Sequence, residues 1–89
     1  MTESPRIIHL NPKDNVAVAL KPLRPGELAA GVPIVEPIPM GHKVSLAAIP
    51  AGGDVVKYGE VIGIATAAIE PGHHVHVQNV RSARLPARA

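Results

Sequence analysis

Histidine is the residue type in this chain with the most chemical potential, and three of its five histidines, His73, His74 and His76, lie within four residues. His74 and His76 are two positions apart, so on a strand they would project from one face, whereas His73 would project from the other. Two imidazoles on one face can hold a metal ion or an anionic substrate. Two imidazoles do not complete a metal site, and the same pattern is typical of exposed turn histidines. We therefore assign no metal ligand from spacing alone.

A second polar cluster, Gly41-His42-Lys43, follows a turn and precedes a predicted strand. Held there, His42 could exchange a proton near neutral pH, and Lys43 offers a point charge for a carboxylate or phosphate. Two solvated side chains on a β-turn would give the same pattern. Because His42 and His76 both come shortly after a glycine turn, we expect them on one side of the domain with Lys43 nearby.

The elements that must position these side chains are short strands separated by turns. Alternating or β-branched apolar runs predict strands at residues 7–10, 15–20, 32–35, 43–47, 54–58, 61–65 and 74–77. Ten prolines leave no window for a long helix, because an interior proline costs a helix about 3 kcal/mol. We therefore predict no helix longer than about two turns.

One turn pattern recurs four times in the chain. Each copy has an aliphatic residue, a proline one or two places later, and glycine in the fourth place. The copies are Leu23-Arg24-Pro25-Gly26, Ile38-Pro39-Met40-Gly41, Ile49-Pro50-Ala51-Gly52 and Ile69-Glu70-Pro71-Gly72. Proline sets φ for a turn and glycine can adopt positive φ. The irregular spacing predicts recurring turns in one compact β domain rather than a solenoid.

Composition excludes several classes of protein. Tyr58 is the only aromatic residue, so stacking surfaces for single-stranded nucleic acid or sugar rings are not expected. The chain has no cysteine, which excludes disulfides and thiolate metal sites. No long apolar run or signal-peptide pattern occurs, so we expect a cytoplasmic protein without a membrane partner.

The chain is short enough for a single domain. We expect that domain to span residues 7–80, between a flexible N-terminus at 1–6 and a flexible basic tail at 81–89, which carries Arg81, Arg84 and Arg88.

Four motifs occur in an order that resembles the altronate/galactarate dehydratase family, in its small amino-terminal domain of the SAF group. They are Asp14-Asn15-Val16-Ala17-Val18-Ala19, Ile38-Pro39-Met40-Gly41-His42-Lys43-Val44, Lys57-Tyr58-Gly59-Glu60-Val61-Ile62-Gly63 and Val75-His76-Val77-Gln78-Asn79. The similarity covers roughly residues 7–80. It implies an all-β, compact β-clip (SAF-like) domain of short strands and Pro/Gly turns.

The resemblance also implies an enzyme. The family eliminates water from sugar acids such as altronate or galactarate, commonly with a divalent metal such as iron or manganese, and the small domain works with a larger catalytic domain or subunit. We therefore expect this chain to be the small subunit of a hydro-lyase. Alone it should be inactive and should self-associate or bind the large subunit, which would hold most of the metal's ligands.

Site roles are assigned on the same basis. His42 and His76 are the expected catalytic residues, and Lys43, Lys57 and Asn79 the expected substrate-binding residues. One position departs from the family, which often has a histidine where this chain has Gln78. Glutamine cannot take up a proton and is a poor metal ligand. Two alternatives share the motifs: a small subunit of a sulfolactate sulfo-lyase, and a non-catalytic SAF module that binds a carbohydrate or a protein.

Overall fold

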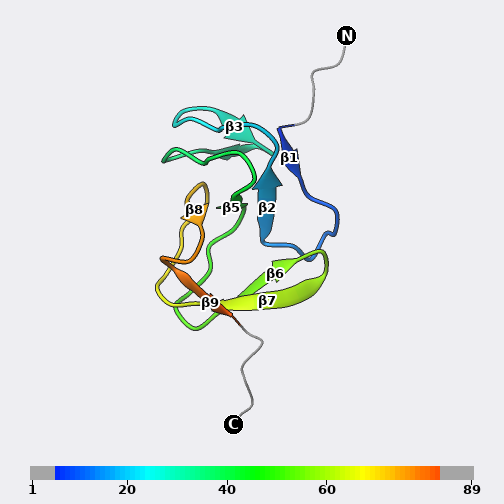
Figure 1. Ribbon diagram of the computed structural model, residues 1–89, viewed down its shortest axis with the longest axis vertical. Coiled ribbons are helices and arrows are strands. Elements are labelled where there is room, and N and C mark those ends of the chain that lie inside the picture. The colour runs from blue at the N-terminus through cyan, green and yellow to red at the C-terminus, as the bar shows by residue number, and fades with distance from the viewer. Residues whose placement is uncertain (1–5, 83–89) are drawn as a thin grey trace.

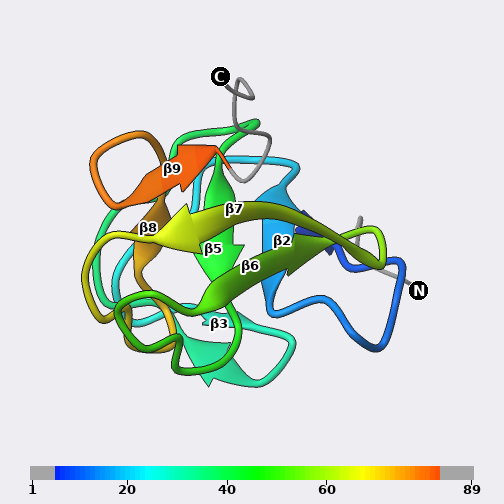
Figure 2. The same cartoon turned by 90° about the horizontal axis from the view of Figure 1, so that it is seen from below.

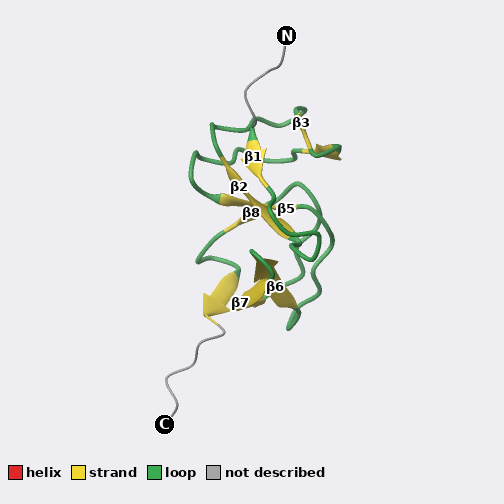
Figure 3. Ribbon diagram, turned by 90° about the vertical axis from the view of Figure 1, so that its right-hand side faces the viewer, coloured by secondary structure: helices red, strands yellow, loops and turns green. Residues whose placement is uncertain are grey.

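The computed structural model describes residues 6–82, and these form an all-β domain without a helix, as the proline content predicts (Figure 3). The strands are β1 (Ile7–Ile8), β2 (Val16–Ala19), β3 (Leu28–Ala29), β4 (Val32–Pro33), β5 (Lys43–Ser45), β6 (Asp54–Lys57), β7 (Glu60–Ala65), β8 (His74–Val75) and β9 (Val80–Ser82). Within the described residues there is accordingly no helix able to span a membrane.

The strands form three antiparallel sheets, with the orders β1-β2-β5-β8, β3-β4 and β6-β7-β9. The four-stranded sheet lies in the middle of the molecule, with the β3–β4 hairpin toward one end and the three-stranded sheet toward the other (Figure 1). Seen from below, β6 and β7 cross β2 and β5 (Figure 2). The middle sheet is therefore covered on two sides.

The core is aliphatic and divides into two clusters. The first consists of Ala17, Ala19, Leu23, Ala29, Ile34, Ile38 and Val44, and the second of Val16, Ile49, Val55, Ala65, Ile69 and Val75. Because successive side chains of a strand alternate between faces, β2 sends Ala17 to the first cluster and Val16 to the second. The middle sheet therefore connects both parts of the core.

The recurring aliphatic–Pro–Gly pattern has a tertiary counterpart. Leu23 and Ile38 form an isolated antiparallel bridge, and Ile49 and Ile69 form another. Each bridge has two backbone hydrogen bonds of 2.8 or 2.9 Å. The first pair lies in the first core cluster and the second pair in the second. The four copies thus act in pairs, each holding one end of the core together.

The turns follow the predicted chemistry, and the strand limits are corrected at several points. Among the turn glycines, Gly41 has φ 85° and Gly72 has φ 87°. β3 and β9 were not expected, because each pairs through few residues with a weak apolar pattern. Residues 76 and 77, expected in a strand, belong to a bend and a turn.

β9 reaches Ser82, so Arg81 and Ser82 pair with β7, although we expected them in the basic tail. The remainder of that tail and most of the expected flexible N-terminus lie outside the described residues.

Candidate metal and substrate site

Three imidazoles meet at the edge of the four-stranded sheet. The ring centroids of His42 and His76 are 4.3 Å apart, those of His42 and His74 are 5.0 Å apart, and those of His74 and His76 are 5.5 Å apart. One ligand nitrogen from each lies within 4.8 Å of the others, and all three residues are half-buried. We call these residues the histidine cluster. The predicted convergence of His42 and His76 is confirmed, and His74 joins them.

Strand register explains why His42 and His76, 34 positions apart, converge. Lys43 pairs with Val75 and Val44 with His74 across β5 and β8. One further step along this antiparallel ladder places His42 opposite His76, and directly opposed residues share a face. The Gly41 turn fixes the approach to β5, because the His42 N–H donates to the Pro39 carbonyl at 3.0 Å and its carbonyl accepts the Ala19 N–H at 2.8 Å.

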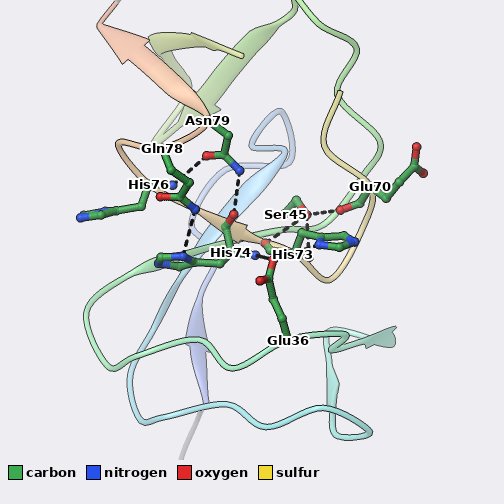
Figure 4. A network of polar contacts seen from close by, with 8 residues as sticks. All are labelled: Glu36, Ser45, Glu70, His73, His74, His76, Gln78 and Asn79. Carbon is green, nitrogen blue, oxygen red and sulfur yellow. Dashed lines mark hydrogen bonds and ion pairs between the residues drawn. The ribbon is translucent and has the colours of Figure 1, made fainter. Parts of the chain in front are cut away.

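Asn79 holds the turn that carries His76. Its Oδ1 accepts the His76 backbone N–H at 3.0 Å, and its Nδ2 donates to the His74 carbonyl at 2.9 Å. Both ends of the amide are thus used within the chain, and both contacts are drawn in Figure 4. The side chains of His74 and His76 leave the chain on one side and His73 leaves on the other (Figure 4), which is the arrangement that their spacing predicts.

Two residues that the sequence analysis did not single out anchor β8 from its other side. The Glu36 carboxylate accepts the His74 N–H at 3.0 Å and contacts His73 Nδ1 at 2.9 Å. The fully buried Ser45 donates its hydroxyl proton to the Glu70 carbonyl at 2.6 Å and accepts the His73 N–H at 3.1 Å. Neither residue lies in a motif with a ligand or catalytic spacing, so only the tertiary structure reveals these contacts.

A chain of polar contacts links the imidazoles to Gln78. His42 Nδ1 lies 2.8 Å from His74 Nε2, and His74 Nδ1 lies 3.1 Å from the Gln78 amide nitrogen. One nitrogen of a neutral imidazole donates and the other accepts, so the partner at Nδ1 determines which His74 tautomer forms. Gln78 cannot take up a proton itself, but through this contact it bears on the tautomer of His74.

The electrostatic environment keeps two of the basic groups less basic than usual. Burial lowers the pKa of Lys43, and the positive charge of Lys57 lowers it further. Burial also lowers the pKa of His74, assisted by His42, His76 and Lys43 and opposed by Glu36. Glu36 has a lowered pKa, because hydrogen bonds from the His74 N–H and the His73 ring favour its anion. The His74 ring is accordingly biased toward the neutral form that binds metals.

A mostly apolar hollow of about 160 Å³ adjoins the histidine cluster and is lined by Lys43, Ile62, His76, Val77 and Val80. It places a cationic side chain and an imidazole at one concave surface. A larger hollow of about 280 Å³, lined by Glu60, Val61, Ile62 and Ser82, contains none of the predicted site residues. We regard the smaller hollow as the more relevant one because it contains Lys43 and His76, two of the expected site residues.

The structure brings most of the expected site residues together. His42, His76 and Lys43 surround one region, and Lys57 is close enough to Lys43 to affect its pKa. The Lys57 Nζ also lies 5.1 Å from the centroid of the Tyr58 ring. Asn79 is adjacent, with its amide engaged by the turn. His74 was recognisable from its spacing to His76, but the third histidine of the cluster, His42, comes from the segment between the Gly41 turn and β5.

Comparison with known proteins identifies the family of this chain. The profile of the altronate/galactarate dehydratase SAF domain matches residues 5–83. Galactarate dehydratase (L-threo-forming) of Escherichia coli K12 is 44% identical over 68 residues, which are 73% of this chain and 13% of that protein. Altronate dehydratase of the same strain is 42% identical over 79 residues, 84% of this chain and 16% of that protein.

The (2R)-sulfolactate sulfo-lyase subunit alpha of Paracoccus pantotrophus is 49% identical over 47 residues, which cover 53% of this chain and 70% of the subunit. This chain therefore spans a small fraction of the two dehydratases but most of the length of a separate lyase subunit. The match over residues 5–83 covers all of the described residues, and the chain belongs to the altronate/galactarate dehydratase SAF domain family.

Proposed function

We propose that this chain is the small, SAF-type component of a lyase that removes water from a sugar acid, together with a larger catalytic chain. The observation that carries the proposal is the convergence of His42 and His76 at 4.3 Å, beside Lys43. These residues come from separate motifs of a family whose compared members include altronate and galactarate dehydratases.

Elimination next to a carboxylate needs three contributions from a site. The acid must be held, the negative charge that develops must be stabilised, and the leaving hydroxyl must be protonated. In the proposal, the Lys43 ammonium holds the carboxylate at the hollow, assisted by Lys57. When the cluster holds no metal, His42 or His76, in its protonated form, donates a proton to the leaving hydroxyl. A metal held by the cluster would instead supply Lewis-acid assistance to the same group. Asn79 keeps His76 in position through the two backbone contacts of its amide.

A divalent metal would supply Lewis-acid stabilisation of the developing charge. The family resemblance names iron or manganese. The available donor set is three imidazole nitrogens, which suits iron better than manganese, because manganese favours carboxylate and carbonyl oxygen. We therefore favour iron as the metal of the assembled enzyme.

The shape of the site supports the larger partner of this proposal. The hollow is small and shallow, and β8 is an edge strand of its sheet, so this chain supplies one wall of a site and not an enclosed pocket. The exposed Val77 at the rim of the hollow offers an apolar contact for the partner. Alone, the chain should have no dehydratase activity.

The test is to co-express this chain with a large dehydratase-like chain from the same genome and to assay the pair with altronate and galactarate. His42→Ala and His76→Ala should lower turnover far more than they lower assembly or the unfolding midpoint. His9→Ala, an exposed histidine outside the cluster, is the matched control and should leave turnover unchanged. Robust turnover by the isolated chain would contradict the proposal, and a pair inactive on every substrate would favour a binding module.

A second candidate, the small subunit of a sulfolactate sulfo-lyase, is favoured by one observation. This chain covers 70% of a sulfo-lyase subunit alpha at 49% identity. The two candidates share the carboxylate and differ in the leaving group, which is sulfite in place of water. Including (2R)-sulfolactate in the same assay and measuring released sulfite separates them.

A further inference from the structure

The histidine cluster has a donor arrangement that fits a metal ion held by this chain itself. A Zn²⁺ ion bound to nitrogens at about 2.0–2.1 Å in tetrahedral geometry holds them about 3.3 Å apart. The three ligand nitrogens lie within 4.8 Å of one another, and His42 Nδ1 and His74 Nε2 are 2.8 Å apart. Small rotations of the half-buried rings would lengthen the 2.8 Å distance between His42 Nδ1 and His74 Nε2 and would shorten any distance that is above about 3.3 Å.

The backbone that carries the cluster is already fixed, so little order has to be gained on binding. His42 follows the Gly41 turn and is hydrogen-bonded to β2. His74 N–H is held by Glu36, and His76 N–H is held by Asn79. Such support of ligand positions by surrounding hydrogen bonds is what metal sites require.

Gln78 is placed to supply the outer contact that a metal-bound histidine normally has, once its amide is flipped so that the oxygen and not the nitrogen faces His74 Nδ1. Its side-chain amide lies at His74 Nδ1, the ring nitrogen on the side away from His42. With the amide oxygen directed at Nδ1, the ring carries its proton there and presents the Nε2 lone pair toward the cluster. Oxygen and nitrogen of an amide exchange by a simple flip, so both orientations are accessible at the same contact.

We propose that His42, His74 and His76 bind one divalent transition-metal ion on this chain, with Gln78 as a positioning residue for His74. The ligand atoms include His42 Nδ1 and His74 Nε2. Three protein ligands leave one or more positions open, as in catalytic metal sites, and the open side adjoins the hollow that His76 shares with Lys43. A hydroxy acid could then place oxygens on the metal and its carboxylate near Lys43.

The metal ligands would then lie on the small chain and not mainly on the large partner, where we first expected them. Metal binding does not depend on the proposed lyase activity, because it is measured on this chain alone. Failure of metal binding would leave the lyase assay unaffected, and failure of the lyase assay would leave the metal site standing.

The binding test uses the full chain without a polyhistidine tag, titrated calorimetrically with Zn²⁺ and, in parallel, with Co²⁺ followed by visible absorption. We expect one ion per chain and the intense bands of low-coordinate Co²⁺. His42→Ala, His74→Ala and His76→Ala should each weaken binding by more than the roughly 10- to 100-fold that loss of an outer contact costs. His9→Ala and His73→Gln remove histidines outside the cluster and should leave the affinity unchanged.

A measurement on the unsubstituted chain identifies the ligands even if some of the variants fail to fold. In long-range ¹H–¹⁵N spectra, Zn²⁺ should shift the ring nitrogens of His42, His74 and His76 and leave those of His9 and His73 in place. Unchanged affinity in the folded His42→Ala/His76→Ala double variant would overturn the proposal. Zn²⁺-induced shifts at His9 or His73 in place of the cluster would do the same.

The positioning role of Gln78 is tested by two measurements, the Zn²⁺ affinity and the tautomer of His74. Gln78→Leu should weaken Zn²⁺ binding by about 10- to 100-fold and change the His74 tautomer in the same spectra. Gln78→Glu should retain binding, because a carboxylate can accept the Nδ1 proton. The side chain is exposed, so the unfolding midpoint should not move. An unchanged tautomer together with unchanged affinity in Gln78→Leu would remove Gln78 from the site.

Discussion

At the residue scale, Asp14 shows how one buried carboxylate anchors a distant hairpin. It is only 6% exposed, and its Oδ1 accepts the Gly59 N–H at 2.7 Å. Burial alone would raise its pKa, but hydrogen bonds from Gly59, Tyr58 and Asn11 and the charge of His9 outweigh it, so the pKa is lowered. The ionised form of Asp14 therefore stabilises the fold.

This shift predicts a pH dependence. A carboxylate with a lowered folded-state pKa contributes stability above its unfolded pKa and loses it as the pH falls through the folded value. In urea denaturation between neutral and acid pH, Asp14→Asn should be less stable than the unsubstituted chain at pH 7, and the difference should shrink at low pH. Asp54→Asn, at an exposed position, is the control. A difference independent of pH would contradict the assignment.

Ser45 is a second residue whose side chain acts through the backbone. Its hydroxyl is fully buried between the Glu70 carbonyl and the His73 N–H. Ser45→Ala removes both contacts, and we expect a loss of about 1–3 kcal/mol in the free energy of unfolding, measured by urea denaturation. Thr66→Ala removes an exposed hydroxyl as the control. Equal midpoints for the two variants would show that the Ser45 hydroxyl is dispensable.

At the element scale, the Pro71-Gly72 turn sets the position of β8 and hence of His74. Gly72 has φ 87°, and a Cβ built there would lie 2.1 Å from the Pro33 carbonyl oxygen. Its own N–H donates to the Ser45 carbonyl and its carbonyl accepts the Val35 N–H. The turn is thus packed against the backbone on two sides, and no side chain fits.

Two glycine-to-alanine substitutions separate the cost of the left-handed backbone conformation from the cost of a steric clash with neighbouring backbone. Gly26 has φ 93° with open space where a Cβ would stand, so Gly26→Ala should cost only the left-handed conformation, about 1–2 kcal/mol. Gly72→Ala adds the clash with Pro33 and should cost clearly more in urea denaturation, with changed ring-nitrogen shifts for His74 and His76. Similar losses for both variants would mean that the turn can move away from β4.

At the scale of the whole molecule, the two core clusters share the middle sheet, so we expect them to unfold together. Leu23 and Ile49, one from each cluster, are 1% and 2% exposed. Leu23→Ala and Ile49→Ala should each cost about 2–5 kcal/mol, a large part of the stability of a small domain. Leu10→Ala, at a residue 72% exposed, should have little effect.

If the two core clusters unfold together, the domain should show a single cooperative transition. Circular dichroism, which reports on all strands, and fluorescence of Tyr58, which follows β6, should show coincident urea transitions in each variant. Transitions that separate in either variant would show that the two ends of the domain fold independently.

Signals within the amino-acid sequence were enough to predict the all-β class and the turns, and they singled out His42 and His76 as candidate site residues. Those signals are local: proline excludes helix, glycine permits positive φ at Gly41 and Gly72, and spacing two puts His74 and His76 on one face. The order of the four motifs also identified the family, because it depends on sequence alone.

Which of these residues meet depends on the folded chain. His42 reaches His76 through the antiparallel register of β5 and β8, and Glu36 reaches His74 across 38 positions. The pairing of Leu23 with Ile38 and of Ile49 with Ile69 likewise requires the folded chain. Strand register is set by burying both core clusters at once, a property of the whole molecule that no local pattern contains.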